Sequence, residues 1–356
     1  MREMKAWVLH DIGAIHLEEA DRPEPAENEV LVAVKAAGIC GSDIPRIYRT
    51  GAHVHPLIPG HEFAGQVVRL GKKVDERWQD QRVGVFPLIP CRNCPPCRKQ
   101  HYELCRGYSY LGSRRDGGFA EYVTVPEWNL IRLPDNVSYR QAAMMEPMAV
   151  AVHAMRSAIP DDADRGMPIA VCGFGTSGIL LAMFLIEAGY SNLYVIGNKD
   201  FQKRTALALG VGAEHFYDNR EGGAQGWLTA QTGGAGVDVF FECVGKNETV
   251  AGAVMGTAPD GTVQLVGNPA SDMAFEKNLY WKILRDQLTV KGSWNSSFRH
   301  DREDDWHYVL DRLQRERIRP EQSITHGFPL DALDQGLLIM RDKLQEYVKV
   351  MIETGA

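Results

Sequence analysis

Hydrophobic and polar residues follow two different patterns along the chain. Up to about residue 125, short alternating runs such as residues 30–34 and 66–68 are separated by glycine and proline. This pattern is typical of β-strands joined by many turns. From Pro168 onward, short apolar runs alternate with longer helical ones, which indicates a parallel sheet with helices on both faces. The chain therefore predicts a mostly β part followed by an α/β part.

The α/β part can be divided further. Its buried strands are predicted at residues 169–172, 193–196, 237–241, 263–266 and 288–290. Residues 179–186 are apolar nearly all round and Gly189 follows them, which predicts a buried helix closed by a C-terminal glycine. Residues 304–317 are rich in charge, so a helix there is expected to face solvent on one side.

A glycine-rich turn directly follows the first of these strands. It reads Gly173-Phe174-Gly175-Thr176-Ser177-Gly178. The three glycines allow a tight turn, a close approach to a pyrophosphate and close packing of helix on strand. The helix start at Thr176 and Ser177 offers free N–H groups to the phosphates. In this strand–turn–helix context the motif predicts a bound dinucleotide.

The residues that choose between NAD and NADP follow the second strand. NAD-binding chains carry an acidic residue about 20 positions after the glycines, but here the strand ends in Gly197-Asn198-Lys199, with Arg204 further on. This leaves space and positive charge for a 2′-phosphate and slightly favours NADP. Alternatively, Asp200 turns back onto the ribose and the cofactor is NAD. Val244, after a later strand, is also assigned to the cofactor site.

Four of the seven cysteines are closely spaced, at positions 91, 94, 97 and 105. This spacing predicts one tetrahedral Zn²⁺ with four protein ligands, which leaves no room for a substrate, so the metal is expected to be structural. An iron–sulfur cluster is disfavoured because the bacterial run has a shorter gap before its last cysteine. Disulfides are disfavoured because the total is odd and the opening residues lack a signal-type apolar segment.

A second set of metal-ligand side chains lies outside this cluster: Cys40, His61, Glu62 and Glu146. Each residue alone also has an ordinary explanation. A single cysteine is commonly a small buried hydrophobe, a single histidine a hydrogen-bonded core residue, and a glutamate before proline a helix start. Only their combination makes a catalytic metal site plausible.

Together, these motifs resemble the zinc-dependent medium-chain dehydrogenases, the alcohol and polyol dehydrogenase family. The resemblance covers nearly the whole chain and rests on Cys40-Gly41-Ser42-Asp43, Gly60-His61-Glu62, the four clustered cysteines, residues 116–122, Glu146-Pro147 and residues 173–178, in the family's order. It implies a GroES-like catalytic domain over residues 1–155 with a zinc lobe at 88–107. A Rossmann domain over 156–296 and a return to the first domain over 297–356 complete the expected fold.

The resemblance also implies two Zn²⁺ per chain and a reaction. Cys40, His61 and Glu146 would bind the catalytic ion, with Glu62 as an exchanging or neighbouring ligand. Hydride would pass reversibly between NAD(P)⁺ and a polyol or polyol phosphate, giving the ketose. Ser42 is the expected first proton acceptor because its hydroxyl can donate and accept. Asp43 is expected to orient His61.

The chain departs from the family in its proton route. Many members carry a histidine five residues after the ligand cysteine, where this chain has Pro45. Since proline cannot titrate, the proton would pass through the cofactor ribose and water, or through His53 or His55. His53 is the sharper hypothesis because it matches the polyol-phosphate members. Both histidines could equally be exposed loop residues.

The substrate itself stays open at this stage. Residues 40–47, 51–53 and 112–118 resemble family members that act on polyol phosphates, and Arg114 and Arg115 could bind the phosphate bidentately. Otherwise these arginines form a solvated pair held by Asp116, and an unphosphorylated polyol of the sorbitol or xylitol type is the substrate. Arg46 and Lys282 are alternative anion contacts.

Composition excludes several other classes. A net charge of −7 argues against nucleic acid as a partner, and no run approaches the ~20 apolar residues that span a bilayer. A cytoplasmic enzyme is therefore expected, and the family resemblance suggests a homodimer or homotetramer. A zinc-free reductase or a non-catalytic NADPH-binding protein on the same fold would be expected to lack the ligands that this chain retains.

Overall fold

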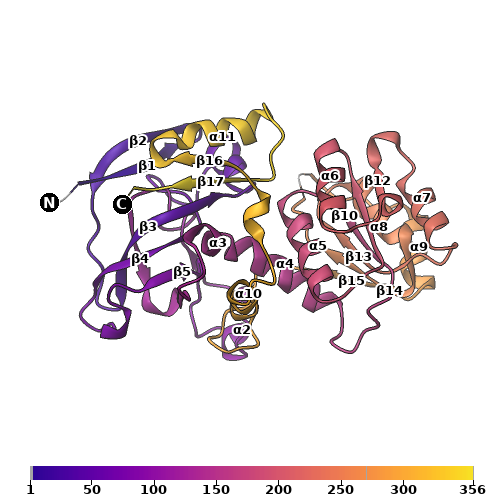
Figure 1. Cartoon of the computed structure of the whole chain (residues 1–356), viewed down its shortest axis with the longest axis horizontal. Helices are drawn as coiled ribbons and strands as arrows, with labels where there is room; N and C mark the ends of the chain where they lie inside the picture. Colours follow the sequence, from indigo (N-terminus) through magenta and orange to yellow (C-terminus); the bar gives the residue numbers. More distant parts are fainter. Residues whose placement is uncertain (1–2, 270, 356) are drawn as a thin grey trace. The chain divides into compact units, whose positions relative to one another are not determined.

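The computed structural model describes residues 3–269 and 271–355 and divides into two compact units (Figure 1). The first contains Met1–Ala149 and Ser297–Ala356, and the second contains Val150–Ser296. The domain limits expected at residues 155 and 297 stay a prediction.

The first unit is built mainly from β-strands. They are β1 (Glu3–Asp11), β2 (Ala14–Asp21), β3 (Glu29–Ile39), β4 (Glu62–Leu70), β5 (Arg82–Val85), β6 (Leu88–Ile89), β7 (Ser109–Tyr110), β8 (Tyr122–Pro126), β9 (Leu130–Arg132), β16 (Ile324–Pro329) and β17 (Lys349–Glu353). Its helices are α1 (Asp43–Pro45), α2 (Pro95–Arg98), α3 (Tyr139–Ala143), α10 (Asp305–Gln314) and α11 (Leu333–Asp342), and α4 (Met145–Ala158) continues into the second unit.

One seven-stranded sheet organises this unit. Its order is β16-β17-β3-β4-β5-β9, and β8 also pairs with β3. The C-terminal strand β17 therefore lies beside β3, with β16 beyond it, although both are distant from β3 in sequence (Figure 1). The predicted run at residues 30–34 is buried along its whole length rather than alternately, because β3 lies inside the sheet with packed residues on both faces.

The second unit alternates strand and helix. Its elements are β10 (Ile169–Cys172), α5 (Thr176–Glu187), β11 (Leu193–Gly197), α6 (Asp200–Ala208), β12 (Phe216–Asp218), α7 (Ala224–Gln231), β13 (Val237–Glu242), α8 (Asn247–Gly256), β14 (Thr257–Leu265), α9 (Lys277–Arg285) and β15 (Thr289–Gly292). The strands form one parallel sheet in the order β12-β11-β10-β13-β14-β15.

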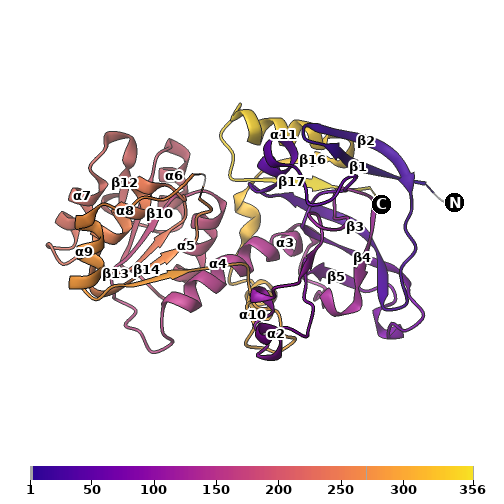
Figure 2. The same cartoon turned by 180° about the vertical axis from the view of Figure 1, so that it is seen from behind.

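Helices cover both faces of this sheet (Figure 2). Leu228 of α7, Ala253 of α8 and Leu279 of α9 share a core with alternate residues of the strands. On the opposite face, α5 approaches β10, where Gly178 lies close to Val171. The predicted Rossmann-type α/β fold with a mostly β domain is confirmed. One expectation was wrong in part: Leu288 is buried, but β15, which begins at the next residue, is an edge strand whose four residues are exposed.

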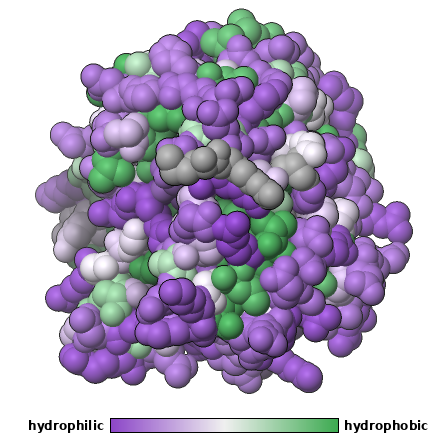
Figure 3. Space-filling model, turned by 90° about the vertical axis from the view of Figure 1, so that its left-hand side faces the viewer, coloured by the Kyte–Doolittle hydropathy of each residue, from purple (hydrophilic) through white to green (hydrophobic). Residues whose placement is uncertain are grey.

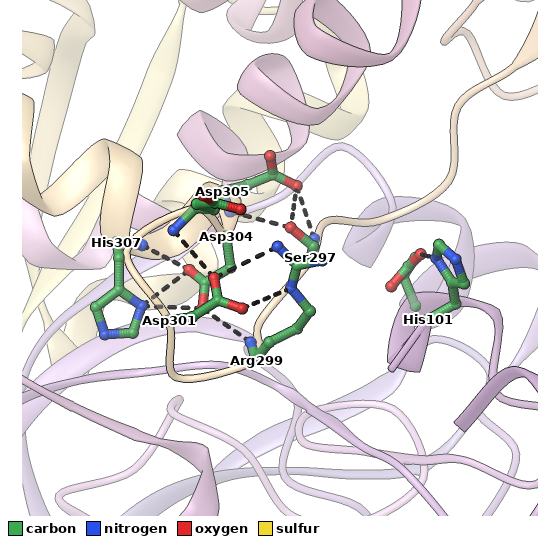
Figure 4. A network of polar contacts seen from close by, with 9 residues as sticks. His101, Ser297, Arg299, Asp301, Asp304, Asp305 and His307 are labelled. Carbon is green, nitrogen blue, oxygen red and sulfur yellow. Dashed lines mark hydrogen bonds and ion pairs between the residues drawn. The ribbon is translucent and has the colours of Figure 1, made fainter. Parts of the chain in front are cut away.

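The segment that returns to the first unit is fixed by two aspartates (Figure 4). Asp305 accepts hydrogen bonds from the Ser297 backbone N–H at 2.8 Å and from its hydroxyl at 2.7 Å. Asp304 accepts one from the Arg299 N–H and one from the His307 N–H, each at 2.8 Å. Asp304 thereby caps the N-terminus of α10, so the turn and the helix stabilise each other.

The surface is mixed in character. The side of the first unit seen in Figure 3 is mostly hydrophilic, with hydrophobic side chains in small scattered groups. Within the described residues, no helix combines the length and the apolar character that crossing a membrane requires.

Candidate active site and metal centres

The four clustered cysteines converge on one point. Their sulfur atoms all lie within 4.8 Å of one another, with Cys94 Sγ 3.4 Å from Cys97 Sγ and 3.9 Å from Cys105 Sγ. These separations match four thiolates around one Zn²⁺ with Zn–S bonds of about 2.3 Å. Backbone N–H groups near Cys97 and Arg106 lower the pKa of Cys94 to about 6, so this sulfur is readily deprotonated for a metal.

Strand pairing creates the second donor cluster. Cys40 follows the end of β3 and Glu62 begins β4, and the register sets Gly38 opposite Glu62. This antiparallel pairing brings Cys40, His61 and Glu62 together, so that one donor atom from each lies within 4.8 Å of the others. A sulfur, an imidazole nitrogen and a carboxylate oxygen are donors that Zn²⁺ accepts.

Asp43 contacts both His61 and Cys40 of this cluster. Its fully buried carboxylate lies 3.4 Å from His61 Nδ1. It also accepts hydrogen bonds from the Cys40 N–H at 2.9 Å and from Arg46 at 2.5 Å. Burial opposes its charge, but His61 and Arg46 outweigh that effect and lower the pKa of Asp43. The carboxylate therefore lies beside the imidazole, and its role in orienting that ring stays a prediction.

The charges around His61 favour a bound cation. Burial lowers the pKa of His61, but Asp43 and Cys40 more than compensate, so that the pKa lies well above its usual range. Among the described residues, His61 Nδ1 has no partner within hydrogen-bonding geometry. A half-buried thiol beside a buried imidazole and a buried carboxylate forms a set that Zn²⁺ would both hold together and neutralise.

Glu146 lies near the cluster but outside the closest group of donors. It is the second residue of α4 and is buried. Its Oε1 accepts a hydrogen bond from the Tyr110 hydroxyl at 3.1 Å, and the Tyr110 ring lies 5.8 Å from that of His61. Burial, together with the charge of Glu62, raises the pKa of Glu146 to about 7. The sequence did not predict Tyr110.

Lys349 is a second residue that the sequence analysis missed. Its ammonium forms an ion pair with Glu62 Oε2, and both side chains are almost completely buried. Burial lowers the pKa of Lys349, but Glu62 and Cys40 reverse that effect and raise it. A signal existed, because Lys349 is the only charged residue in the apolar run from Val348 to Ile352.

The predicted proton-transfer residues lie on neighbouring segments. Ser42 is half-buried and precedes α1, and its hydroxyl makes no capping hydrogen bond there. His53 is exposed, and partial burial followed by the charges of Arg114 and Arg46 lowers the pKa of its ring. His53 is therefore close enough to both cations to be influenced by them.

The two adjacent arginines have different surroundings. Arg115 pairs with Glu29 at 2.8 Å and reaches the Thr124 hydroxyl at 3.2 Å, so contacts within the protein occupy its guanidinium. Arg114 lies 4.7 Å from the centre of the Tyr108 ring, and its buried Nε has no hydrogen-bond partner in the described structure. Asp116 accepts a hydrogen bond from the Ile58 backbone N–H at 2.9 Å.

The glycine-rich turn has the shape that a pyrophosphate requires. Gly173 has a φ of 94°, and a Cβ on Gly178 would lie 2.1 Å from the Gly173 carbonyl oxygen. A Cβ on Gly175 would have no described neighbour within 4 Å. The turn is therefore tightly packed on its inner side and open at Gly175, where phosphates could approach the backbone.

Val244 lies directly beneath this turn, where a Cβ on Gly173 would be 2.6 Å from Val244 Cγ2. The buried Glu242 carboxylate accepts hydrogen bonds from the N–H groups of Val244 at 2.8 Å and Gly245 at 2.9 Å. Glu242, which the sequence analysis did not identify, thereby fixes the loop that supports the turn.

The other predicted cofactor residues follow β11. A Cβ on Gly197 would lie 2.7 Å from Gln202 Oε1, which accepts from the Asn198 N–H at 2.7 Å. Lys199 Nζ lies 5.6 Å from the centre of the Phe201 ring. Asp200 pairs with Arg220 at 2.5 Å, and Arg204 lies on α6.

Two family models match the chain. Residues 26–135 match the alcohol dehydrogenase GroES-like domain, and residues 178–315 match the zinc-binding dehydrogenase domain. The first match includes Cys40, His61, Glu62 and the four clustered cysteines, and the second begins at the last glycine of the cofactor turn.

Relatives of known name agree with these models. The chain is 31% identical to galactitol 1-phosphate 5-dehydrogenase of Escherichia coli K12, over 94% of this chain and 95% of that protein. The solved structure of the E. coli galactitol-1-phosphate dehydrogenase superposes with a TM-score of 0.89 at 29% identity, covering 98% of this chain and all of that one. Sorbitol dehydrogenase of Bacillus subtilis is 32% identical over 76% of this chain and 77% of its own length.

A further solved structure carries a cofactor. It is a zinc-binding dehydrogenase from Sinorhizobium meliloti bound to NADP, with a TM-score of 0.88 at 28% identity, covering 99% of this chain and all of that one. The resemblance seen in the sequence motifs, including their similarity to galactitol-1-phosphate 5-dehydrogenase, is thus confirmed. The chain belongs to the zinc-dependent alcohol and polyol dehydrogenase family of oxidoreductases.

Proposed function

We propose that the protein transfers hydride between NAD(P)⁺ and a secondary hydroxyl of a polyol or polyol phosphate, giving the corresponding ketose. The observation that carries this proposal is the convergence of the half-buried Cys40 with the buried His61 and Glu62, whose donor atoms lie within 4.8 Å of one another. Glu146 would complete the catalytic zinc site, and Cys91, Cys94, Cys97 and Cys105 would hold the structural zinc.

The residues around the cluster divide the remaining tasks. When bound, Zn²⁺ supplies Lewis acidity, which makes a substrate hydroxyl easier to deprotonate. Ser42 accepts that proton, because its hydroxyl has no capping role in α1. Asp43 keeps the His61 ring oriented. The alcohol loses one hydride to the nicotinamide and one proton to the protein, which balances the oxidation to a ketone.

His53 would carry the proton onward. The lowered pKa of its ring keeps it neutral at pH 7, so it can accept a proton from Ser42 through water. Its exposure then allows release to solvent. This route replaces the histidine that the family places where Pro45 stands in this chain.

For the substrate, a polyol phosphate is the first candidate. Arg114 Nε has no hydrogen-bond partner among the described residues, and the charges of Arg114 and Arg46 lower the pKa of His53. Positive charge therefore lies close to a predicted proton-transfer residue. A guanidinium binds phosphate well. The contacts of Arg115 with Glu29 and Thr124 give its predicted phosphate role no support, and Lys282 pairs with Asp286. An unphosphorylated polyol stays the second candidate, since a sorbitol dehydrogenase is among the relatives.

NADP is the favoured cofactor. No acidic side chain can occupy position 197 without displacing Gln202, and Lys199 lies two residues further on. The S. meliloti relative was solved with NADP. The expected cytoplasmic location stays a prediction.

A homodimer is the favoured assembly. β15 is an edge strand with four exposed residues, so its outer backbone groups can pair with a second copy. Nearby on α9, Trp281 and Leu284 are 46% and 52% exposed. A charged pair of substitutions, Trp281→Glu with Leu284→Glu, is expected to halve the mass measured by light scattering. An unchanged mass would point to another interface or to the predicted homotetramer.

A substrate panel tests the reaction. Each polyol would be compared with its phosphate ester, using NAD⁺ and NADP⁺ in turn and following absorbance of the reduced cofactor. Arg114→Gln is expected to raise KM for the phosphate ester while leaving KM for the free polyol unchanged. Arg115→Gln is the matched control. Loss of this guanidinium should make the protein less stable but should not change the preference between the polyol and its phosphate ester. Absence of turnover with every polyol would contradict the proposed function.

A further inference from the structure

The last position of β11, Gly197, has no room for a side chain in this structure. A side chain on Gly197 would collide with Gln202 Oε1 at 2.7 Å and with the Phe216 ring at 2.9 Å. Gln202 is buried and is held by the Asn198 N–H, so it cannot easily move aside. The end of β11 therefore offers neither space nor negative charge for the ribose hydroxyl.

The first carboxylate after β11 is Asp200, and Arg220 neutralises it. Asp200 begins α6, and its Oδ1 lies 2.5 Å from the Arg220 guanidinium. Arg220 follows β12, which pairs with β11 in the sheet. The contact thus joins two segments that both leave the carboxyl edge of the sheet, where dinucleotides bind in folds of this type.

A second carboxylate holds Arg220 in this position. Asp218 accepts from Arg220 Nε at 2.9 Å on each of its oxygens and also from the Arg220 backbone N–H at 3.0 Å. The register places Asp218 opposite Gly197. Hydrogen bonds from Arg220 lower the pKa of Asp218, and Lys203 adds to the effect. Arg220 is therefore anchored beside the very residues that follow β11.

We propose that Arg220 is a specificity-determining residue, which gives NADP⁺ its advantage over NAD⁺ by neutralising Asp200 and by offering its guanidinium to the 2′-phosphate. This inference rests on the proposed function and names the group that decides its cofactor. Arg220 is 53% exposed, so a ligand can reach it without disrupting the fold.

The local charge balance explains the effect. Arg220 contacts both Asp200 and Asp218, Lys203 also acts on Asp218, and Lys199 precedes Asp200 in the sequence. A guanidinium can bind a phosphate and a carboxylate at the same time through its fork of N–H donors. Without Arg220, Asp200 would be free to repel a 2′-phosphate and to accept a hydrogen bond from a 2′-hydroxyl.

Binding of two adenosine nucleotides tests this without any substrate. Adenosine 2′,5′-bisphosphate and 5′-AMP differ only in the 2′-phosphate, and calorimetry would measure their affinity for the full-length protein. Arg220→Ala is expected to weaken the bisphosphate about tenfold or more, the scale of a lost charged hydrogen bond, and to change AMP less than about twofold. Arg220→Lys should retain part of the preference for the bisphosphate over AMP. Adding Asp200→Asn to the Arg220→Ala protein should restore part of that preference.

Arg285→Ala is the matched control, because Arg285 lies on α9 and contacts Trp281. It should change neither affinity. Equal weakening of both nucleotides by Arg220→Ala would mean that Arg220 only maintains local structure, and would overturn the inference. A wild-type protein that binds the bisphosphate no better than AMP would overturn it too. Suppose that Arg220→Ala weakens only the bisphosphate and that the wild-type protein oxidises no polyol. This result would support the role of Arg220 and reject the proposed reaction.

Discussion

Lys349 and Glu62 form a buried ion pair that crosses over Gly38 in the central strand of the first unit. Lys349 begins β17 and Glu62 begins β4, on either side of β3. A Cβ on Gly38 would lie 2.2 Å from Glu62 Oε2 and 2.7 Å from Lys349 Cε. The pair therefore depends on a glycine at this position, and it sets the charge of a candidate zinc ligand.

Removing the lysine is expected to destabilise the protein. Lys349→Met would leave the buried Glu62 charge without its partner, at a cost of about 3–5 kcal/mol, measured by urea unfolding. Glu62→Gln in the Lys349→Met protein should recover much of that loss, because no buried charge is then left unpaired. A double variant no more stable than Lys349→Met would show that the pair does not explain the loss.

Two glycines of the cofactor turn should respond differently to alanine. Gly178→Ala is expected to cost about 2 kcal/mol or more, because its Cβ would lie 2.1 Å from the Gly173 carbonyl oxygen. A Cβ on Gly175 would have no described atom within 4 Å, so Gly175→Ala should leave the melting temperature unchanged. Nucleotide affinity should fall about tenfold, because the methyl group would lie where the pyrophosphate approaches the backbone. Calorimetric melting and nucleotide titration would check both. A Gly175→Ala protein with normal affinity would exclude a phosphate at this point.

The two metal centres should separate experimentally. Elemental analysis is expected to find two Zn²⁺ per chain, in keeping with a four-cysteine site and an open site. Cys40→Ser should reduce this to one and abolish turnover with little change in melting temperature. Cys97→Ser should instead lower the melting temperature, because structural zinc contributes directly to folding. Full activity in Cys40→Ser would show that the catalytic assignment is wrong.

The pH dependence of turnover tests the proton route. Because the pKa of His53 is lowered, its neutral form persists below pH 6.5, and activity should decline only at more acidic pH. Arg114 is one cause of that lowering, after partial burial, so Arg114→Gln should shift this decline to higher pH. His53→Asn should lower turnover and remove the decline altogether. An unaltered profile in His53→Asn would place the proton route elsewhere.

The parts of the site that were predictable are those with local spacing. The four cysteines lie within fifteen consecutive positions and the three glycines within six, so their convergence follows from the turns of one short segment. The strand at residues 169–172 and the buried helix after it were also predictable, because apolar periodicity is local. Cys40, His61 and Glu62 could be grouped only through the family resemblance, and β3–β4 pairing explains why they meet.

The sequence by itself determined the fold class, the family and the types of donor available for two zinc ions. Only the tertiary structure decided how the charged side chains are paired. Glu62 meets Lys349 across 287 positions and Arg115 meets Glu29 across 86, while Asp200 meets Arg220 across 20. Such pairs depend on strand order and register, which no local pattern encodes. For that reason the contacts of Tyr110 and Glu242, the pairing of Lys349 with Glu62 and the pairing of Arg220 with Asp200 became visible only in the folded chain.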